Sequence, residues 1–102
     1  MTRIENNKET NMLIDVKRDI LHQLNYNEAG INIEFLKVNG ELRKMLSTLC
    51  PDLILENMKS DNYKYEPEEV LQHSAINVFD IDKQEWRSFR WDSVIAFGGD
   101  NA

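Results

Sequence analysis

The sequence predicts an α+β fold that is mainly β: a small antiparallel barrel of about five strands, preceded by an amphipathic helix. Short segments in which apolar and polar residues alternate are separated by tight turn signals, a pattern typical of antiparallel strands. The chain has 102 residues, of which 41% are hydrophobic. A chain of this length can bury a core without a metal or a disulfide.

The chain divides into a flexible N-terminus at residues 1–9 and a single domain at residues 10–102, because the first nine residues are mostly polar. A helix is expected at residues 11–25, since apolar residues recur there at helical spacing. These residues are Met12, Leu13, Val16, Ile20, Leu21 and Leu24. Polar and charged residues fill the opposite face, so the helix has one apolar stripe to pack on the barrel.

The barrel is expected at residues 31–97 and begins with a hairpin. Residues 31–38 alternate up to Phe35 and then lose the alternation. Residues 41–49 form the partner strand, with a bulge or bend where its alternation is imperfect. Asn39-Gly40 between them predicts a type I′ turn, which needs positive φ at both residues. Pro51 ends the second strand.

A mobile acidic loop is expected at residues 56–70. This segment is polar and rich in acids, and Pro67 lies inside it. Pro67 also suits the first position of a short helical turn at the end of the loop.

Three further strands complete the predicted barrel, at residues 74–81, 86–90 and 94–97. A four-residue turn at 82–85 joins the first two, and a tight turn at 91–93 joins the last two. All connections within this half are short, which favours antiparallel neighbours.

Both tryptophans of the chain lie in the run Trp86-Arg87-Ser88-Phe89-Arg90-Trp91. Alternation along a strand places Arg87, Phe89 and Trp91 on one face and Trp86, Ser88 and Arg90 on the other. In one interpretation an aromatic set fills the barrel, and the arginines pair with Asp80, Asp82, Glu85 or Asp92. In the other, an exposed aromatic residue with Arg87 or Arg90 binds an anionic ligand or an acidic strand of a partner. A small barrel needs aromatic bulk for its core, which favours the first interpretation and leaves the second open.

Patterns typical of catalysis or metal binding are absent from the sequence. His22 and His73 lie far apart, and neither has a cysteine or carboxylate at the spacing of a metal site. The single cysteine, Cys50, has no basic neighbour that would activate its thiol. We therefore expect no enzyme activity, no metal and no cofactor.

Charge and hydropathy narrow the classes of partner. The net charge is −6, which disfavours strong non-specific binding to nucleic acid, because that binding depends on neutralising phosphates. Half of the twelve basic residues nevertheless lie in or beside predicted strands, where they can share one side of the sheet: Lys37, Arg43, Lys44, Lys83, Arg87 and Arg90. The sequence has neither a membrane-spanning apolar run nor an apolar signal core, so we expect a cytoplasmic protein without membrane contact.

Two blocks of the sequence resemble a known family. Residues 78–81, a four-residue turn and residues 86–95 (Trp-Arg-Ser-Phe-Arg-Trp-Asp-Ser-Val-Ile) are similar to the end of WYL-type domains. Residues 35–45 and 48–54 resemble the opening of the second WYL family. The resemblance covers residues 31–97 and implies an SH3-like or Sm-like barrel, in a family of small stand-alone proteins that tailed bacteriophages often carry.

The resemblance also implies a function. The leading hypothesis is that the chain is a non-enzymatic, phage-type accessory protein in the host cytoplasm, which binds a host or phage macromolecule and modulates the activity of that macromolecule. Larger WYL domains use basic strand residues for nucleic acid or nucleotides, which gives the alternative of a regulatory module that senses a nucleotide or single-stranded nucleic acid. The candidate binding residues are Arg43, Trp86, Arg87, Arg90 and Trp91. We expect a protein partner first, and a homo-oligomer through strand edges stays open.

Overall fold

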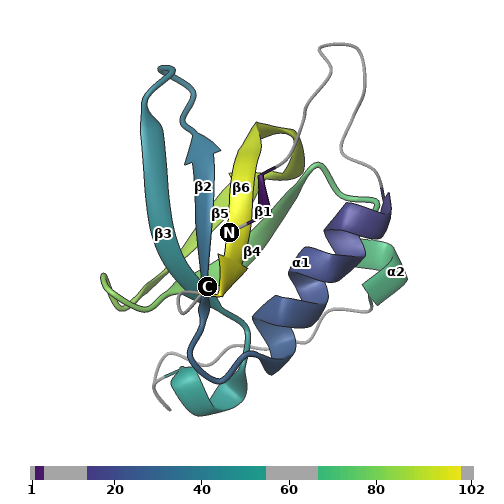
Figure 1. The fold of residues 1–102 in the computed structure, drawn as a ribbon, viewed down its shortest axis with the longest axis vertical. Coiled ribbons are helices and arrows are strands. Elements are labelled where there is room, and N and C mark those ends of the chain that lie inside the picture. Colours follow the sequence, from purple (N-terminus) through teal and green to yellow (C-terminus); the bar gives the residue numbers. More distant parts are fainter. Residues whose placement is uncertain (1, 4–13, 55–66, 100–102) are drawn as a thin grey trace.

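The computed structural model describes residues 2–3, 14–54 and 67–99 (Figure 1). Within them, one antiparallel sheet has the strand order β1-β6-β2-β3-β4-β5. The strands are β1 (Thr2–Arg3), β2 (Ile31–Leu36), β3 (Leu42–Thr48), β4 (Ala75–Asp80), β5 (Glu85–Arg90) and β6 (Val94–Gly99). This arrangement confirms the predicted mainly β fold with an N-terminal helix.

The amphipathic helix packs against the curved sheet as its apolar stripe predicts. Helix α1 runs from Ile14 to Tyr26, and the expected start at residues 11–13 lies outside the described residues. Its stripe of Ile20, Leu21 and Leu24 is buried and packs into the core with strand residues. The N–H of Leu49 donates to the carbonyl oxygen of Leu24 at 2.9 Å, which ties the helix to the chain just after β3.

The hairpin of β2 and β3 is present, but the predicted type of its turn is wrong. The turn is not type I′, because Gly40 has φ +87° while Asn39 has no positive φ. Gly40 N–H donates to the Lys37 carbonyl oxygen, and Lys37 N–H donates to Glu41, so the left-handed residue follows an ordinary tight turn. Of the two irregularities expected in β3, a bulge or a bend, the bulge is absent from its pairing with β2, which is continuous. The irregularity lies between Glu34 and Phe35, where β2 pairs with β6.

The second half of the sheet follows the predicted order closely. Strands β4 and β5 pair in continuous register and are joined by the turn at residues 81–84. A 3-10 turn at Trp91–Ser93 then leads directly into β6. Another 3-10 turn at Pro51–Leu53 follows β3, where Pro51 was expected to end the strand.

Two short elements refine the predicted loops. Within the N-terminus predicted to be flexible, Thr2–Arg3 form β1, which pairs with Phe97 and Ala96 of β6. At the end of the predicted acidic loop, Pro67–Val70 form helix α2, in agreement with the helical turn expected from Pro67. Residues 55–66, which include most of that loop, lie outside the described residues.

Gly30 is the point where the chain leaves α1 and enters β2, and we expect Gly30→Ala to destabilise the fold. Its φ is +76°, and a Cβ there would lie 2.6 Å from Cδ1 of Ile81 and 3.2 Å from the carbonyl oxygen of Ser47. The left-handed backbone and this close approach together should lower the free energy of unfolding by about 2 kcal/mol, measured by urea denaturation.

The matched control is Gly40→Ala in the hairpin turn. Gly40 also has positive φ, but a Cβ there meets nothing within 4 Å. This variant should lose only the backbone contribution, about 1 kcal/mol. Equal losses for the two variants would contradict the close approach at Gly30.

Candidate binding groove

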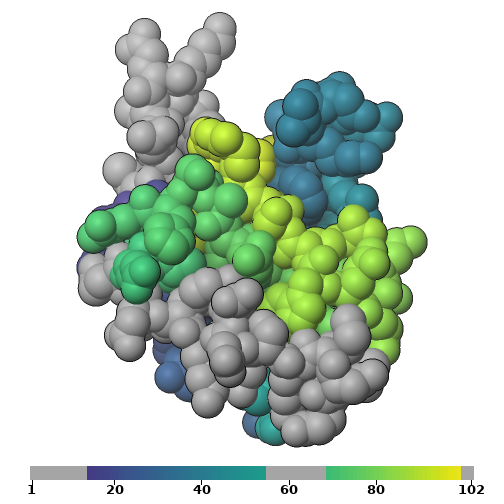
Figure 2. Space-filling view, turned by 180° about the vertical axis from the view of Figure 1, so that it is seen from behind, coloured from purple at the N-terminus to yellow at the C-terminus, as the bar shows by residue number. Residues whose placement is uncertain are grey.

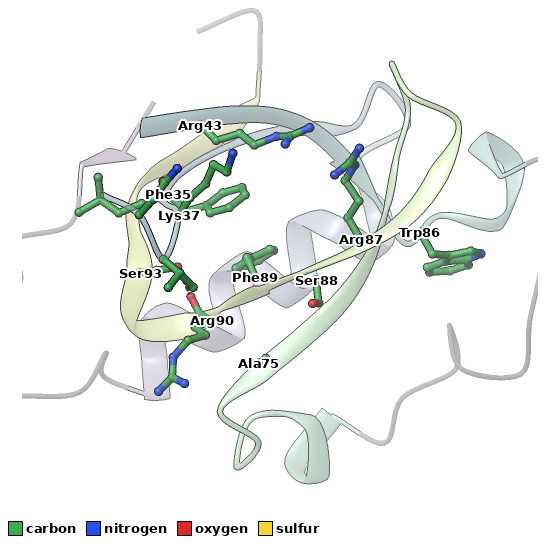
Figure 3. Close-up of a pocket in the computed structure, with 13 residues that line it drawn as sticks. Phe35, Lys37, Arg43, Ala75, Trp86, Arg87, Ser88, Phe89, Arg90 and Ser93 are labelled. Carbon is green, nitrogen blue, oxygen red and sulfur yellow. Dashed lines mark hydrogen bonds between the residues drawn. The ribbon is translucent and has the colours of Figure 1, made fainter. Parts of the chain in front are cut away.

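A groove of about 850 Å³ lies between β5 and the projecting β2–β3 hairpin. Figure 2 shows the hairpin as a separate blue lobe above the yellow-green surface of β5. The walls are formed by residues 35–39 of the hairpin, Arg43 of β3 and residues 86–90 of β5. The curvature of the sheet therefore brings two distant segments of the sequence together around one hollow (Figure 3).

The floor of the groove is the top of the aromatic core. Phe35 and Phe89 stack with ring centroids 5.8 Å apart, and Phe89 meets the edge of Trp91 at 6.0 Å. Phe35 is only 8% exposed and Phe89 only 3%. These rings stabilise the barrel and give the groove an apolar base, but they offer little open aromatic surface.

Arg43 is the cation of the groove that lacks a counter-ion among the residues that the structure describes. It pairs with Phe35 across β2 and β3, so it shares the inward face of the sheet with that ring. Its guanidinium reaches across the groove toward Arg87 (Figure 3). Lys37 lies beside it, but the Lys37 ammonium is 3.7 Å from the carboxylate of Glu41.

Arg87 also points into the groove, but its charge is neutralised by carboxylates. Its Nε lies 3.3 Å from Oδ2 of Asp80, and its Nη2 contacts the carboxylate of Glu85. The Asp80 side chain is 4% exposed, and its Oδ1 accepts the N–H of Lys83 at 2.9 Å. Arg87 therefore holds a buried carboxylate at the β4–β5 turn, a structural task that limits its use in binding.

Trp86 and Arg90 lie on the other face of β5. Trp86 meets the edge of Phe79 with centroids 5.6 Å apart, and both side chains labelled Trp86 and Arg90 point away from the groove in Figure 3. Nε of Arg90 donates to Oδ1 of Asp92 at 3.2 Å. This hydrogen bond and the charge of Asp92 raise the pKa of Arg90, so its guanidinium remains cationic throughout the physiological range.

Trp91 belongs to the core. It is 2% exposed, and its indole N–H has no acceptor among the residues that the structure describes. Lys17 of α1 lies with its Nζ 5.8 Å from the centre of the Trp91 ring and donates to the carbonyl oxygen of Leu71. Trp91 therefore joins helix, turn and sheet.

The five predicted binding residues thus divide into three places. Arg43 and Arg87 meet in the groove, Trp86 and Arg90 face the other way, and Trp91 is buried. The predicted alternation of β5 is confirmed, and so is the pairing of its arginines with Asp80, Glu85 and Asp92.

Sequence reasoning missed the aliphatic wall of the groove. Leu36 is 45% exposed and Val38 is fully exposed at the hairpin turn, and both line the groove. The signal for this wall was the loss of alternation after Phe35, which puts apolar residues where a strand would present polar ones.

The two histidines and the cysteine form no catalytic or metal site in the described part of the chain. His22 is exposed and packs on Tyr26 with ring centroids 4.8 Å apart, His73 is exposed, and Cys50 is a buried free thiol. Among residues 2–3, 14–54 and 67–99, no three potential ligands gather around a metal position. No helix in the same ranges is long and apolar enough to span a membrane.

Comparison with known proteins gives one match, which covers most of the chain. No curated protein and no solved structure was found to match. Residues 19–95 match the family model of WYL_2, described as an Sm-like SH3 β-barrel fold. This span contains most of α1, all strands from β2 to β5 and the beginning of β6, so the match covers the groove as well as the core. The chain therefore belongs to the WYL_2 family of Sm-like SH3 β-barrels.

Proposed function

We propose that this chain is a non-enzymatic binding module that holds a segment of a partner protein in the groove and modulates the activity of that partner. The Sm-like SH3 barrel is usually a non-catalytic fold. The observation that carries the proposal is the position of Arg43: a cation without a described counter-ion, at a groove with aliphatic walls. In the phage setting that the sequence resemblance implies, the partner would be a host or phage protein.

The charges of the groove favour a protein segment over nucleic acid. Lys37, Arg87 and Arg90 each have a carboxylate partner, so they contribute little net positive potential. The whole chain carries −6. Polyphosphate binding needs several uncompensated cations, whereas one carboxylate of a protein segment needs a single guanidinium.

The aromatic residues favour the same conclusion. Proteins that bind single-stranded nucleic acid offer open aromatic faces on which bases stack. Phe35, Phe89 and Trp91 are at most 8% exposed, and their ring faces are used in packing. The exposed apolar side chains at the groove are aliphatic, Leu36 and Val38, and these suit the side chains of a protein segment.

A nucleotide or single-stranded nucleic acid is the second candidate, because three cationic side chains lie at the groove, those of Lys37, Arg43 and Arg87. The two candidates differ in a simple binding assay. A sensor of this kind should bind a labelled single-stranded oligonucleotide or a nucleotide at low salt, where phosphate contacts are strongest. We expect no such binding by the wild-type chain, and clear binding that Arg43→Ala abolishes would overturn the preference for a protein partner.

The proposed function is tested by comparing Arg43→Ala with Lys44→Ala in a pull-down with mass spectrometry. Both variants remove one positive charge from β3, but Arg43 points into the groove, whereas Lys44 is exposed on the opposite face of the strand and does not line the groove. A tagged wild-type chain and the Lys44 variant should retain the same partner, while the Arg43 variant retains at most about a tenth as much. Equal retention by all three chains would show that the groove is not the binding surface.

A further inference from the structure

The sheet has one edge that no strand covers in the described part of the chain. β5 is the last strand in the order, and its only partner there is β4. At the other end of the order, β6 is extended by β1, a segment far from it in the sequence. An edge strand presents a row of unpaired N–H and C=O groups, which can pair with another extended chain.

This free edge borders the groove. β4 lies on one side of β5 and the hairpin on the other, so the unpaired side of β5 faces the hollow (Figure 3). Five consecutive residues of β5, 86–90, line the groove. An extended segment lying there would follow β5 along its length rather than cross it.

The opposite wall supplies side-chain contacts for such a segment. Leu36 and Val38 are exposed on the hairpin, and Phe35 lies at the base between hairpin and β5. Val38 belongs to a turn held by backbone hydrogen bonds of Lys37, so the aliphatic wall is preformed. Every second side chain of an added strand would point into this apolar space.

Arg43 sets the charge of the occupant. It faces the groove without a described carboxylate within ion-pair distance, while Arg87 opposite it is neutralised by Asp80 and Glu85. One acidic side chain on the added segment would therefore neutralise Arg43, whereas a basic side chain would be repelled by two guanidinium groups.

We propose that the occupant is an extended acidic and aliphatic segment of a partner protein, which adds to the sheet as a strand along β5 and places a carboxylate on Arg43. This inference rests on the proposed function and specifies how the partner binds. Backbone pairing with β5 supplies affinity, the wall of Leu36 and Val38 selects aliphatic side chains, and Arg43 selects the acid.

The test uses synthetic heptapeptides in which valine or isoleucine alternates with aspartate or glutamate, and a matched set with lysine in place of the acids. Binding to the whole chain is measured by fluorescence anisotropy. Acidic peptides should bind and lysine peptides should not. Arg43→Ala should weaken binding about tenfold or more, and Lys44→Ala, on the opposite face of β3, less than about twofold. Circular dichroism confirms that both variants remain folded.

Strand addition has a signature of its own in the peptide backbone. N-methylation of single peptide amides should abolish binding at alternate positions and leave it nearly unchanged at the positions between, because only every second N–H of an added strand faces β5. Binding that depends on Arg43 but tolerates N-methylation everywhere would overturn strand addition and leave the proposed function intact.

Two further results separate the inference from the proposed function. If no peptide binds, yet the partner from the pull-down still depends on Arg43, then an acidic extended strand is the wrong occupant and the groove remains the binding site. The second result is a stable dimer in sedimentation that does not bind the peptide. If neither Arg43→Ala nor the N-methylated peptides affect formation of this dimer, a second copy of the chain covers β5 and the inference is wrong.

Discussion

Replacing Trp91 with alanine is expected to lower the free energy of unfolding by about 3–5 kcal/mol, a large part of the stability of a domain of this size. Trp91 is 2% exposed and belongs to the main core cluster. Its backbone N–H donates to the carbonyl oxygen of Ser74 at 3.1 Å, within the 3-10 turn that joins β5 to β6. Alanine would leave a cavity at the point where helix, turn and floor of the groove meet.

The other tryptophan supplies the matched control. Trp86→Ala also removes an indole, but from the half-buried outer face of β5, so its loss should be clearly smaller. Urea denaturation followed by far-ultraviolet circular dichroism measures both, because that signal does not depend on the tryptophans. Similar losses for the two variants would contradict the central place given to Trp91.

Trp91→Phe separates ring bulk from the indole N–H. That N–H is buried and has no acceptor among the described residues, so phenylalanine gives up no hydrogen bond there. Most of the apolar contact with Phe89 is kept, and the expected loss is about 1–2 kcal/mol. A loss as large as that of alanine would mean that the indole nitrogen has a partner essential for the fold.

Most of the fold could be predicted because its strands carry local signals. Residues 31–35 alternate, Asn39-Gly40 marks a turn, and the two segments around residues 81–84 are strand-like with few residues between them. Such patterns depend only on neighbours along the chain, so they can be recognised in a single sequence.

The parts of the fold that escaped prediction are set by partners far away in the sequence. β1 has two residues, too few for any period, and it is a strand only because β6 offers it an edge. The register shift near Glu34 arises where β2 changes its pairing with β6, and the sequence of β2 alone does not mark it.

The candidate groove shows the same division. Alternation alone predicted that Arg87 and Arg90 lie on opposite faces of β5, because successive side chains of a strand point to opposite faces of the sheet. The acids that neutralise Lys37, Arg87 and Arg90 lie within a few residues of them or on the adjoining strand. Only the family resemblance placed Arg43 and Arg87 in one predicted site. Alternation could not do so, since β3 and β5 are separated by β4 and only the curvature of the whole sheet brings the two arginines across one hollow.

Arg87→Ala is expected to cost about 3 kcal/mol of unfolding free energy, at the lower end of the range for breaking a buried ion pair, because the Arg87 side chain is one-third exposed. The variant would leave the Asp80 carboxylate, 4% exposed, without its counter-ion. Asp80 would keep only the N–H of Lys83 as a described hydrogen-bond donor. Urea denaturation of the purified variant measures the loss.

Asp80→Asn should cost less, about 1 kcal/mol, since the amide oxygen can still accept from Lys83 and Arg87 keeps Glu85 as a partner. The sharper result concerns the double variant. Arg87→Ala combined with Asp80→Asn no longer buries an unpaired charge, so it should be more stable than Arg87→Ala alone. Losses that simply add would show that the two side chains do not depend on each other.

The stability of the double variant decides how the contributions of Arg43 and Arg87 to binding are to be compared. If Asp80→Asn restores stability to the Arg87 variant, the main task of Arg87 is to neutralise a buried carboxylate, and any weaker binding by Arg87→Ala contains a contribution from the unfolded chain. The double variant then isolates the contribution of Arg87 to binding, because it lacks the guanidinium but remains folded. Binding that is close to wild type in the double variant and lost in Arg43→Ala would assign recognition of the partner's acid to Arg43, the groove arginine without a described counter-ion.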